Sequence, residues 1–270
     1  MQVVLCAMAK NEHLYINEWV KHYVGLGFDK IYIYDNDDKN AEYIGSYIDR
    51  KYADIVEIKN VRGMSRVGLQ HDVYTMFYWK YRNTFDYCLF CDIDEFLVGI
   101  DNIKTFLQGK SFMQMRIKWR LFGDDNVIKR DMSIPVKDFF KKEIKESLTN
   151  DLLRKNNLEN QAKFIIKGGM SCVYINSCHY GSFGNLSNEP IKSILPSGKP
   201  CASKVCINED YSGETVFLNH YMTKTLDEFI KQKLNRNDAV FNKRLKLNYF
   251  WRINKKTPKK IAYLKNLGLE

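Results

Sequence analysis

Apolar runs of strand length alternate with amphipathic stretches from residue 2 to residue 91, and this alternation limits the fold more than any other feature of the chain. Residues 2–9 and 30–34 form two such runs, and between them Ile16, Trp19 and Tyr23 recur at helical spacing. A strand, a helix and a second strand within about 35 residues is the size of a βαβ unit, whose two strands are parallel. The pattern continues with a helix at 40–51, a strand at 54–61, a helix at 69–81 and a strand at 87–91. We therefore expect an α/β fold with a mostly parallel, Rossmann-like sheet and flanking helices.

Polar residues follow three of the expected strands at the point where each strand ends. The three clusters are Lys10, Asn11 and Glu12, then residues 35–38, then residues 92–95. Because the carboxyl ends of parallel strands lie along one edge of a sheet, we expect the clusters to converge there, where open α/β sheets bind ligands. Neither a Gly-x-Gly-x-x-Gly nor a Gly-x-x-x-x-Gly-Lys-Ser/Thr sequence follows the first strand, so a glycine cradle for phosphates has no support. A nucleotide bound at this edge would need a cation to neutralise its phosphates.

Three carboxylates directly follow the expected strand at 87–91. On an extended chain Asp92 and Asp94 point to the same side, so that both can face one divalent ion while Ile93 returns to the core. Carboxylate oxygens are the ligands that Mg²⁺ and Mn²⁺ prefer. The alternative is a solvated turn, although three carboxylates after so apolar a run repel one another unless a cation compensates them.

The alternation becomes looser beyond residue 101. We expect a helix at 102–108 and a strand at 112–119 that leads to a turn with Asp124 and Asp125. A peripheral helical insertion at 136–160 and a long loop or lid at 181–213 are expected to lie on either side of two strands, 163–167 and 172–176. The last elements expected are a strand at 215–221 and a helix at 225–234. Two of these strands lead to histidines, His179 and His220. The histidines at 13, 22 and 71 lie on expected helices or their ends, where a structural role is favoured.

The formal net charge of +10 is concentrated at the C-terminal end. Residues 224–270 contain 13 Lys and Arg against 4 Asp and Glu, and large aromatic residues lie among the basic ones. Such a segment suits an interfacial helix on an anionic membrane, and it equally suits a docked helix with a solvated basic face. No recognised RNA- or DNA-binding module accompanies these charges, so no nucleic acid partner is expected.

Other features of the sequence favour a cytoplasmic protein, with peripheral attachment to the inner face of the cell membrane as an option. No apolar run reaches the 18 to 20 or so residues of a membrane span, and the N-terminal residues lack the pattern of a signal peptide. The seven cysteines are an odd number without zinc-ribbon spacing, which favours reduced, buried thiols.

An ordered set of motifs resembles the glycosyltransferases of family 92 and the related bacterial branch of family 2. The set comprises Ala-Lys-Asn-Glu within residues 7–12, Glu-Trp at 18–19, Asp-Asn at 35–36, Gln70, Asp-Ile-Asp-Glu-Phe at 92–96, Trp119 with Phe-Gly at 122–123, and Asn-His-Tyr, Lys-Thr and Glu-Phe within 219–229. The likeness covers roughly residues 2–235. It implies a nucleotide-diphospho-sugar transferase fold of the GT-A type, a nucleotide-sugar donor with UDP favoured, and Mn²⁺ or Mg²⁺ as cofactor.

The resemblance also assigns roles to residues of this chain. It implies that Asp94 is the first metal ligand, that Asp92 meets either the ribose or the metal, and that His220 either completes the metal shell or contacts the diphosphate. It places Asp35 and Asn36 at the uracil or ribose side of the donor, and Lys224 near a phosphate. The remaining donor-site candidates are Lys10, Asn11, Glu12 and Gln70.

An inverting sugar transfer needs a general base for the acceptor hydroxyl. Asp124 or Asp125 is the first candidate, and Glu95 is a rival that is equally suited to orienting its neighbours. Trp119 is interpreted as a platform for the acceptor sugar, with a core role as the alternative. His179 is the other candidate at the acceptor site.

The function expected from the sequence is metal-dependent transfer of a sugar, a hexose first, to a glycan or lipid-linked hydroxyl in surface polysaccharide or glycoconjugate synthesis. The catalytic domain would span residues 1–235, followed by the basic aromatic segment 236–270. Two alternatives stay open, a non-catalytic membrane- or polyanion-binding protein on a degenerate α/β scaffold and a metal-dependent nucleotidyl or phosphoryl transferase.

Overall fold

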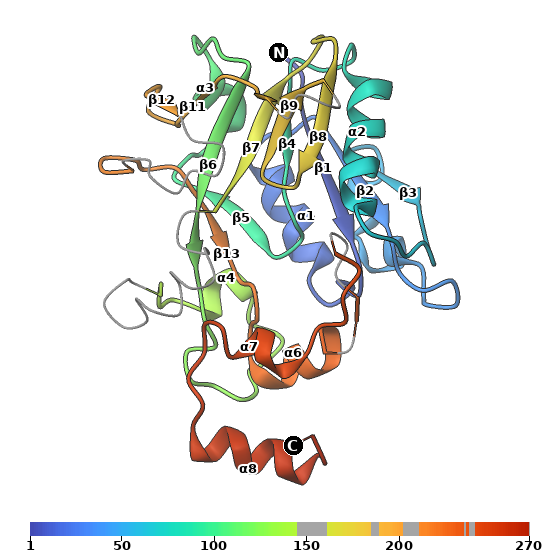
Figure 1. The fold of residues 1–270 in the computed structure, drawn as a ribbon, viewed down its shortest axis with the longest axis vertical. Coiled ribbons are helices and arrows are strands. Elements are labelled where there is room, and N and C mark those ends of the chain that lie inside the picture. The colour runs from blue at the N-terminus through green and yellow to red at the C-terminus, as the bar shows by residue number, and fades with distance from the viewer. Residues whose placement is uncertain (145–160, 185–188, 202–210, 235, 238–240, 270) are drawn as a thin grey trace.

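A mixed sheet with helices on both faces forms the body of the protein in the computed structural model (Figure 1). The structure describes residues 1–144, 161–184, 189–201, 211–234, 236–237 and 241–269. No helix within these described residues is long and apolar enough to cross a membrane. The expected α/β fold with a mostly parallel sheet is confirmed.

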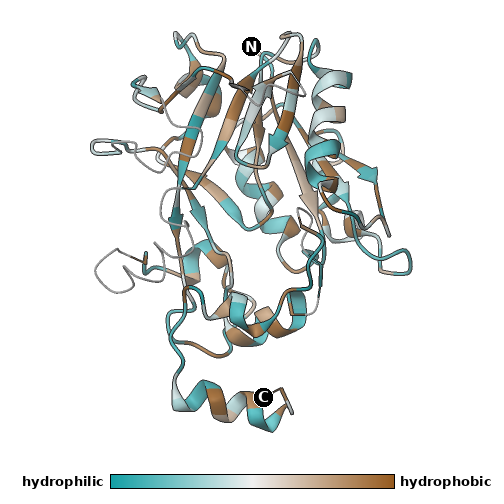
Figure 2. Ribbon diagram, in the orientation of Figure 1, coloured by the Kyte–Doolittle hydropathy of each residue, from teal (hydrophilic) through white to brown (hydrophobic). Residues whose placement is uncertain are grey.

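Four parallel strands form one half of the large sheet. They are β1 (Val3–Ala9), β2 (Lys30–Asp35), β3 (Val56–Asn60) and β4 (Tyr87–Phe90), and their order across the sheet is β3-β2-β1-β4. β1 and β4 are buried at every position, as strands covered on both faces are. Hydrophobic residues accordingly run through the central strands in Figure 2.

The two faces of the sheet are covered by different helices. Alternate residues of β1 point to opposite faces, so Leu5 lies in one core cluster with Trp19 of α1 (Ile16–Gly25), whereas Cys6 lies in another with Phe77 of α2 (Leu69–Tyr81). The residues predicted for both helices match those observed to within a residue. α3 (Ile103–Leu107) is also present and begins at Asn102, whose side chain accepts hydrogen bonds from the backbone of Lys104 and Thr105.

The second half of the sheet comes from the C-terminal part of the chain. β7 (Ala162–Lys167) pairs antiparallel with β4 on one side and with β6 (Gln114–Leu121) on the other, and two short strands, β11 (Ser193–Ile194) and β12 (Pro200–Cys201), extend the sheet beyond β6. Below them, β13 (Phe217–His220) joins the lower end of β6 to β5 (Glu95–Val98) (Figure 1). A separate small sheet contains β8 (Val173–Ser177), β9 (Tyr180–Phe183) and β10 (Glu189–Pro190).

Two expectations for secondary structure differ from the structure. The helix expected at residues 40–51 is replaced by two short 3₁₀ turns, Ile44–Tyr47 and Arg50–Tyr52, because Gly45 and Ser46 are poor helix formers in the middle of the segment. The segment 181–213 is not an irregular loop at its described positions, since β11 pairs with β6 inside the main sheet. Of the insertion expected at 136–160, the structure describes the short helix α4 (Val136–Phe139), and residues 145–160 lie outside the described part.

The C-terminal segment packs beneath the sheet and is not one continuous helix. α6 (Leu226–Gln232) begins with a capping box between Thr225 and Glu228 and is followed by α7 (Leu247–Phe250) and α8 (Pro258–Asn266). Phe250 of α7 and Leu264 of α8 form a small core with Phe229 of α6. Most of the large side chains of this segment therefore point inward, and α8 forms the lower end of the molecule (Figure 1).

Candidate functional site

A pocket of about 610 Å³ opens at the carboxyl ends of β1 and β4. Its walls come from distant parts of the chain: Ala9 at the end of β1, Asp92 after β4, Lys163 on β7, His220 on β13 and Tyr249 on α7. The expected convergence of polar groups at this sheet edge is thus observed in part. The C-terminal segment contributes Arg236, Tyr249 and Arg252 to the same pocket.

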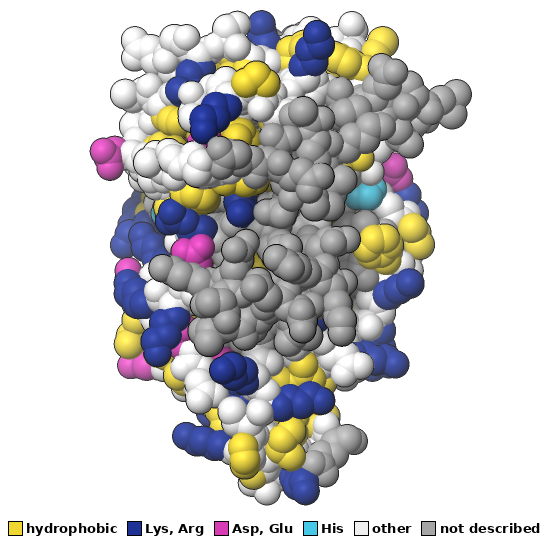
Figure 3. Space-filling view, turned by 60° about the vertical axis from the view of Figure 1, so that its left-hand side comes forward, with side chains coloured by type: hydrophobic (Ala, Val, Ile, Leu, Met, Phe, Trp, Pro, Cys, Tyr) yellow, Lys and Arg dark blue, Asp and Glu magenta, His cyan; other side chains and the backbone are white. Residues whose placement is uncertain are grey.

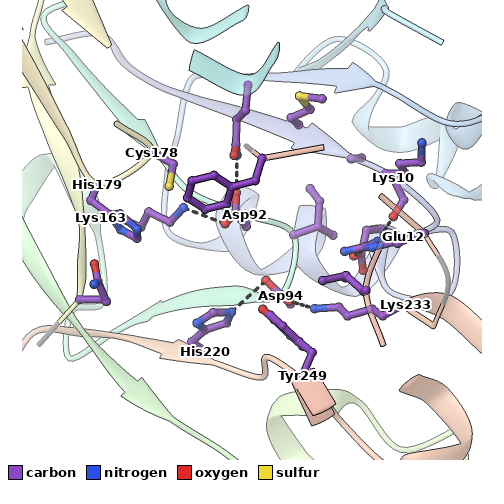
Figure 4. Close-up of a pocket in the computed structure, with 18 of the residues that line it drawn as sticks. Lys10, Glu12, Asp92, Asp94, Lys163, Cys178, His179, His220, Lys233 and Tyr249 are labelled. Carbon is purple, nitrogen blue, oxygen red and sulfur yellow. Dashed lines mark hydrogen bonds and ion pairs between the residues drawn. The ribbon is translucent and has the colours of Figure 1, made fainter. Parts of the chain in front are cut away.

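The side chains of Asp92 and Asp94 do not point toward a common site, although on an extended chain they would lie on the same side. The chain turns between β4 and β5, with the Glu95 N–H donating to the Asp92 carbonyl oxygen at 3.1 Å. This turn sends the Asp92 side chain toward β7 and the Asp94 side chain toward β13 and α6 (Figure 4). Ile93 is buried between them, as predicted.

Both carboxylate oxygens of Asp92 already have protein partners. The Gln70 side-chain amide donates to Oδ1 at 2.8 Å, and Lys163 Nζ donates to Oδ2 at 2.7 Å. Burial alone would raise the pKa of Asp92, but the neighbouring Lys163 ammonium outweighs it and holds the pKa below the usual value. Asp92 is therefore an ionised group held in place by the protein itself.

Asp94 lies between a histidine and a lysine. His220 Nε2 lies 3.4 Å from Asp94 Oδ1, and Lys233 Nζ donates to the other oxygen, Oδ2 (Figure 4). Burial opposes ionisation of Asp94, but Lys233 and His220 outweigh it, so the pKa of Asp94 lies well below its usual range. Burial lowers the pKa of His220, which leaves that imidazole neutral and able to act as a ligand near neutral pH.

Asp94, Glu95 and His220 together form the cluster in the described residues that fits a metal ion. Their ligand atoms lie within 4.8 Å of one another, and all three side chains are buried. Glu95 Oε1 and His220 Nδ1 are buried without a hydrogen-bond partner among the described residues. Asp94 and His220 also line the pocket, so a carboxylate, which is a ligand type that Mn²⁺ and Mg²⁺ prefer, lies there beside a neutral imidazole.

Glu95 itself lies beneath the pocket and is fully buried. Its Oε2 accepts the Asp92 N–H at 2.9 Å, while its backbone carbonyl accepts hydrogen bonds from Trp19 Nε1 and the Tyr23 hydroxyl, both at 3.0 Å. Burial raises the pKa of Glu95 well above its usual value. Lys163 lowers this pKa, but the charges of Asp92 and Asp94 raise it further. This placement fits the orienting role, because Glu95 fixes the turn that carries both aspartates.

The polar cluster after β1 forms another wall of the pocket. Lys10 and Glu12 line it, and Arg236 binds both, donating to the Lys10 carbonyl oxygen and lying 3.1 Å from Glu12 Oε1. Lys224 lies behind this wall, 3.9 Å from Glu12 Oε2, and burial lowers its pKa. Lys224 does not line the pocket, so the structure places it as a support for Glu12.

The polar cluster after β2 lies outside the pocket and is engaged in structural contacts. Asp35 is buried beside Arg62 at 3.7 Å, and the Asn36 amide donates to the carbonyl oxygens of Val61 and Met64 at 3.0 and 2.9 Å. The Asn11 N–H donates to Asp37 Oδ1 at 2.5 Å. Asn36 does line a much smaller hollow with Lys10 and Asn237, both of which also line the main pocket.

An aromatic group forms the wall of the pocket next to Asp92. The Trp119 ring lies 4.3 Å from the His220 ring and 5.2 Å from the His179 ring, measured between centroids. His179 Nδ1 lies 2.9 Å from the Ala162 carbonyl oxygen, and burial together with Lys163 lowers the pKa of His179 to about 3. In the neutral ring Nδ1 donates to that carbonyl, which leaves the lone pair on Nε2.

Asp124 and Asp125 do not reach the pocket. Asp124 is buried in an ion pair with Lys260 of α8, and its backbone N–H donates to Asn254 Oδ1 at 2.8 Å. Asp125 Oδ2 accepts the Lys141 N–H at 3.2 Å. Asp124 thus has its partners in the C-terminal segment and Asp125 has its partner just after α4, so both carboxylates are engaged in structural contacts.

Sequence reasoning identified Lys10 but missed the other four basic side chains of the pocket. Lys163, Lys233, Arg236 and Arg252 all line it, yet none belongs to a motif. Lys163 carries one signal, because a lysine at the start of an otherwise apolar strand needs a buried partner. Its partner Asp92 lies 71 residues away, and the pairing of β7 with β4 that joins them is not visible locally.

Structures of S. aureus TarS are among the solved structures that are similar to this chain. The structure of TarS residues 1–349 has a TM-score of 0.37 and 14% identity, covering 62% of this chain and 47% of that one. Its complex with UDP has a TM-score of 0.35 and 15% identity, covering 48% and 38%. The complex with UDP-GlcNAc has a TM-score of 0.33 and 14% identity, covering 78% and 62%. The chain spans less than two thirds of the length of each.

A family assignment follows from the sequence over nearly its whole length. A search of curated protein sequences found no match. The family model for glycosyltransferase family 92 matches residues 2–249, a range that includes every residue lining the pocket except Arg252. The chain belongs to glycosyltransferase family 92.

Proposed function

We propose that this protein transfers a sugar, a hexose first, from a nucleoside diphosphate sugar to a hydroxyl group of a glycan or lipid-linked acceptor. UDP is the favoured nucleotide. The observation that carries the proposal is the composition of the pocket, in which five basic side chains face three carboxylates. The basic residues are Lys10, Lys163, Lys233, Arg236 and Arg252. An excess of cations at the carboxyl edge of an α/β sheet suits a diphosphate.

The reaction breaks the bond between the sugar carbon and the diphosphate oxygen and forms a bond from that carbon to the acceptor oxygen. The diphosphate leaves with both bonding electrons, and the acceptor hydroxyl loses its proton to a base. Following the resemblance of the motifs, we propose one displacement with inversion at the sugar carbon. Basic side chains that line the pocket stabilise the charge that grows on the departing diphosphate, which favours the transition state over the bound substrate.

We propose Mn²⁺ or Mg²⁺ as the cofactor, held by Asp94 and His220 with Glu95 next to them. Bound there, the ion would act as a Lewis acid toward the diphosphate oxygens. Asp92 then acts through its two hydrogen bonds, keeping Lys163 and Gln70 in place at the edge of the pocket. Trp119 and His179 are proposed to contact the acceptor. His179 lies on the side of the pocket away from Lys10 and Glu12 (Figure 4), and the Trp119 ring lies next to it at 5.2 Å.

We also propose that α8 attaches the protein to anionic membranes from the cytoplasmic side. Lysine and arginine side chains surround the lower end of the molecule in Figure 3. The exposed lysines there are Lys255, Lys256, Lys259 and Lys265. Because Phe250 and Ile253 are buried, the attachment would be electrostatic and would not involve an inserted aromatic face.

Donor binding is the first test of this function. Isothermal titration of UDP and of GDP, each with and without Mn²⁺, should detect one nucleotide that binds more tightly with the ion. A panel of sugars on that nucleotide should then release the free nucleoside diphosphate when incubated with the protein. Asp94→Asn should remove the effect of Mn²⁺, whereas Asp101→Asn, at an exposed carboxylate outside the pocket, should retain it. Absence of binding by both nucleotides in all conditions would reject the proposal.

A further inference from the structure

The carboxylate proposed to hold the metal ion already has a cation of the protein's own. Lys233 follows the last turn of α6, and its Nζ donates to Asp94 Oδ2 and, at 2.6 Å, to the Met222 carbonyl oxygen. The Lys233 side chain is 6% exposed and that of Asp94 is 7% exposed. The pair is therefore a built and nearly solvent-free contact between two segments 139 residues apart.

The neighbouring aspartate is neutralised in the same way. Lys163 Nζ lies 2.7 Å from Asp92 Oδ2 and 3.7 Å from Glu95 Oε1. Two lysines thus face the two aspartates of the turn and balance their charges. A divalent ion that arrives at Asp94 meets an ammonium group already bound to the same carboxylate, and the two positive charges repel each other at short range in a buried site.

The pocket offers Lys233 another partner once a nucleotide is bound. Lys233 lines the pocket together with Arg236 and Arg252, so a diphosphate in the pocket would lie within reach of its flexible four-carbon side chain. The diphosphate is the group whose negative charge rises during the reaction. Movement of the Lys233 ammonium from Asp94 to the diphosphate would free Asp94 Oδ2 and place a cation on the leaving group in one step.

We propose that Lys233 is the resident counterion of Asp94 and that a divalent ion binds Asp94 tightly only when the donor diphosphate takes over Lys233. This rests on the function proposed above. Metal ion and nucleotide then bind as a coupled pair, and each tightens the binding of the other by the same factor. In the absence of nucleotide, Lys233 keeps the site closed to metal ions.

The test measures Mn²⁺ binding directly, by the electron paramagnetic resonance signal of the free ion, with and without UDP. Without UDP, Lys233→Gln should bind Mn²⁺ at least tenfold more tightly than the unaltered protein, because the competing charge is gone while a hydrogen bond to Asp94 can still form. In the unaltered protein UDP should tighten Mn²⁺ binding strongly, and in Lys233→Gln this gain should shrink. In EDTA, Lys233→Gln should also bind UDP several-fold more weakly.

A matched control is available on the same helix. Lys231 is two residues earlier, is 61% exposed and pairs with Asp227 on the surface, so Lys231→Gln should leave Mn²⁺ binding unchanged. Thermal unfolding checks that each variant is folded, and Lys233→Met removes the same charge with an apolar side chain if the Gln variant does not fold. Equal Mn²⁺ affinities of the unaltered protein and the folded Lys233 variant without UDP would overturn the inference. Failure of UDP and GDP to bind would instead reject the proposed function, since the Mn²⁺ comparison without nucleotide does not depend on it.

Discussion

Lys163 Nζ lies 2.7 Å from Asp92 Oδ2, and the lysine side chain is only 1% exposed. Burial opposes the charge on Lys163, but Asp92 and Glu95 outweigh it and raise the pKa of the lysine well above its usual value. The strand that ends in the carboxylates, β4, is thus joined to β7 by backbone pairing and by this ion pair. The same contact fixes one wall of the pocket.

Removing the lysine charge should destabilise the fold. Lys163→Met leaves Asp92 and Glu95 without their common cation, and breaking a buried pair from one side typically lowers the free energy of unfolding by about 3 kcal/mol. Urea denaturation at pH 7 measures this loss. Lys167→Met is the control, because Lys167 is exposed at the other end of the same strand and its exchange should change stability by less than about 0.5 kcal/mol. Equal stabilities of the two variants would contradict the structural role of Lys163.

Burial of neutral His22 should make the fold less stable as the pH is lowered. Burial lowers the pKa of His22 to about 4, with Lys137 adding to this and the Leu97 carbonyl, 2.9 Å from Nε2, opposing it. The unfolded chain has a histidine pKa of about 6.5, so below that pH the unfolded state binds more protons and stability falls as pH is lowered from about 6.5 to 4. Between pH 7 and pH 5 this one residue should lower the free energy of unfolding by about 2 kcal/mol.

Two variants isolate that contribution. When the pH is lowered from 7 to 5, the free energy of unfolding of His22→Gln should fall by about 2 kcal/mol less than that of the unaltered protein. Urea denaturation at the two pH values measures both changes. Lys21→Gln, exposed on the same helix, should follow the unaltered protein. An identical pH dependence for His22→Gln and the unaltered protein would show that the histidine is not buried in its neutral form.

Electrostatic attachment to membranes should depend on salt. Each basic residue near an anionic surface adds about 1 kcal/mol, and this attraction is screened as salt increases. The protein should sediment with vesicles that contain phosphatidylglycerol at low salt and be released at about 0.5 M salt. Exchange of Lys255, Lys256, Lys259 and Lys265 for Gln should abolish sedimentation, while exchange of four exposed lysines elsewhere, Lys39, Lys51, Lys80 and Lys192, should not. Equal sedimentation of the two variants would remove α8 from the interaction.

The parts of the fold that depend on local pattern could be predicted from the sequence. β1, α1, β2, α2 and β4 follow from apolar runs and helical spacing within a few residues of chain, and the turn with Asp92 and Asp94 was identified because it directly follows β4. The direction of those two side chains could not be predicted. It depends on Lys163 from β7 and Lys233 after α6, which lie 71 and 139 residues away from their partners.

The assignment of the C-terminal segment shows the same limit. Its charge and aromatic content are equally typical of a surface helix and of a docked one, and the choice depends on whether a complementary surface exists. Phe229 and Leu226 of α6 supply that surface for Phe250 and Leu264. A domain boundary at residue 235 would separate residues that line the same pocket, because Arg236 and Tyr249 follow that position in the sequence and still line the pocket.

Asp124 provides the clearest test of the catalytic assignments. It pairs with Lys260, which is 1% exposed, so Asp124→Asn should lower the free energy of unfolding by about 3 kcal/mol in urea and leave the rate of sugar transfer per folded molecule unchanged. Asp125→Asn should change neither, because Asn tolerates the positive φ of 49° at that position. The two variants are compared by kcat at a temperature where both are folded. Loss of a general base lowers rates by at least about 100-fold. Such a loss in either variant would place that carboxylate at the reacting hydroxyl, and the turn after β6 would then have to move toward the pocket during catalysis.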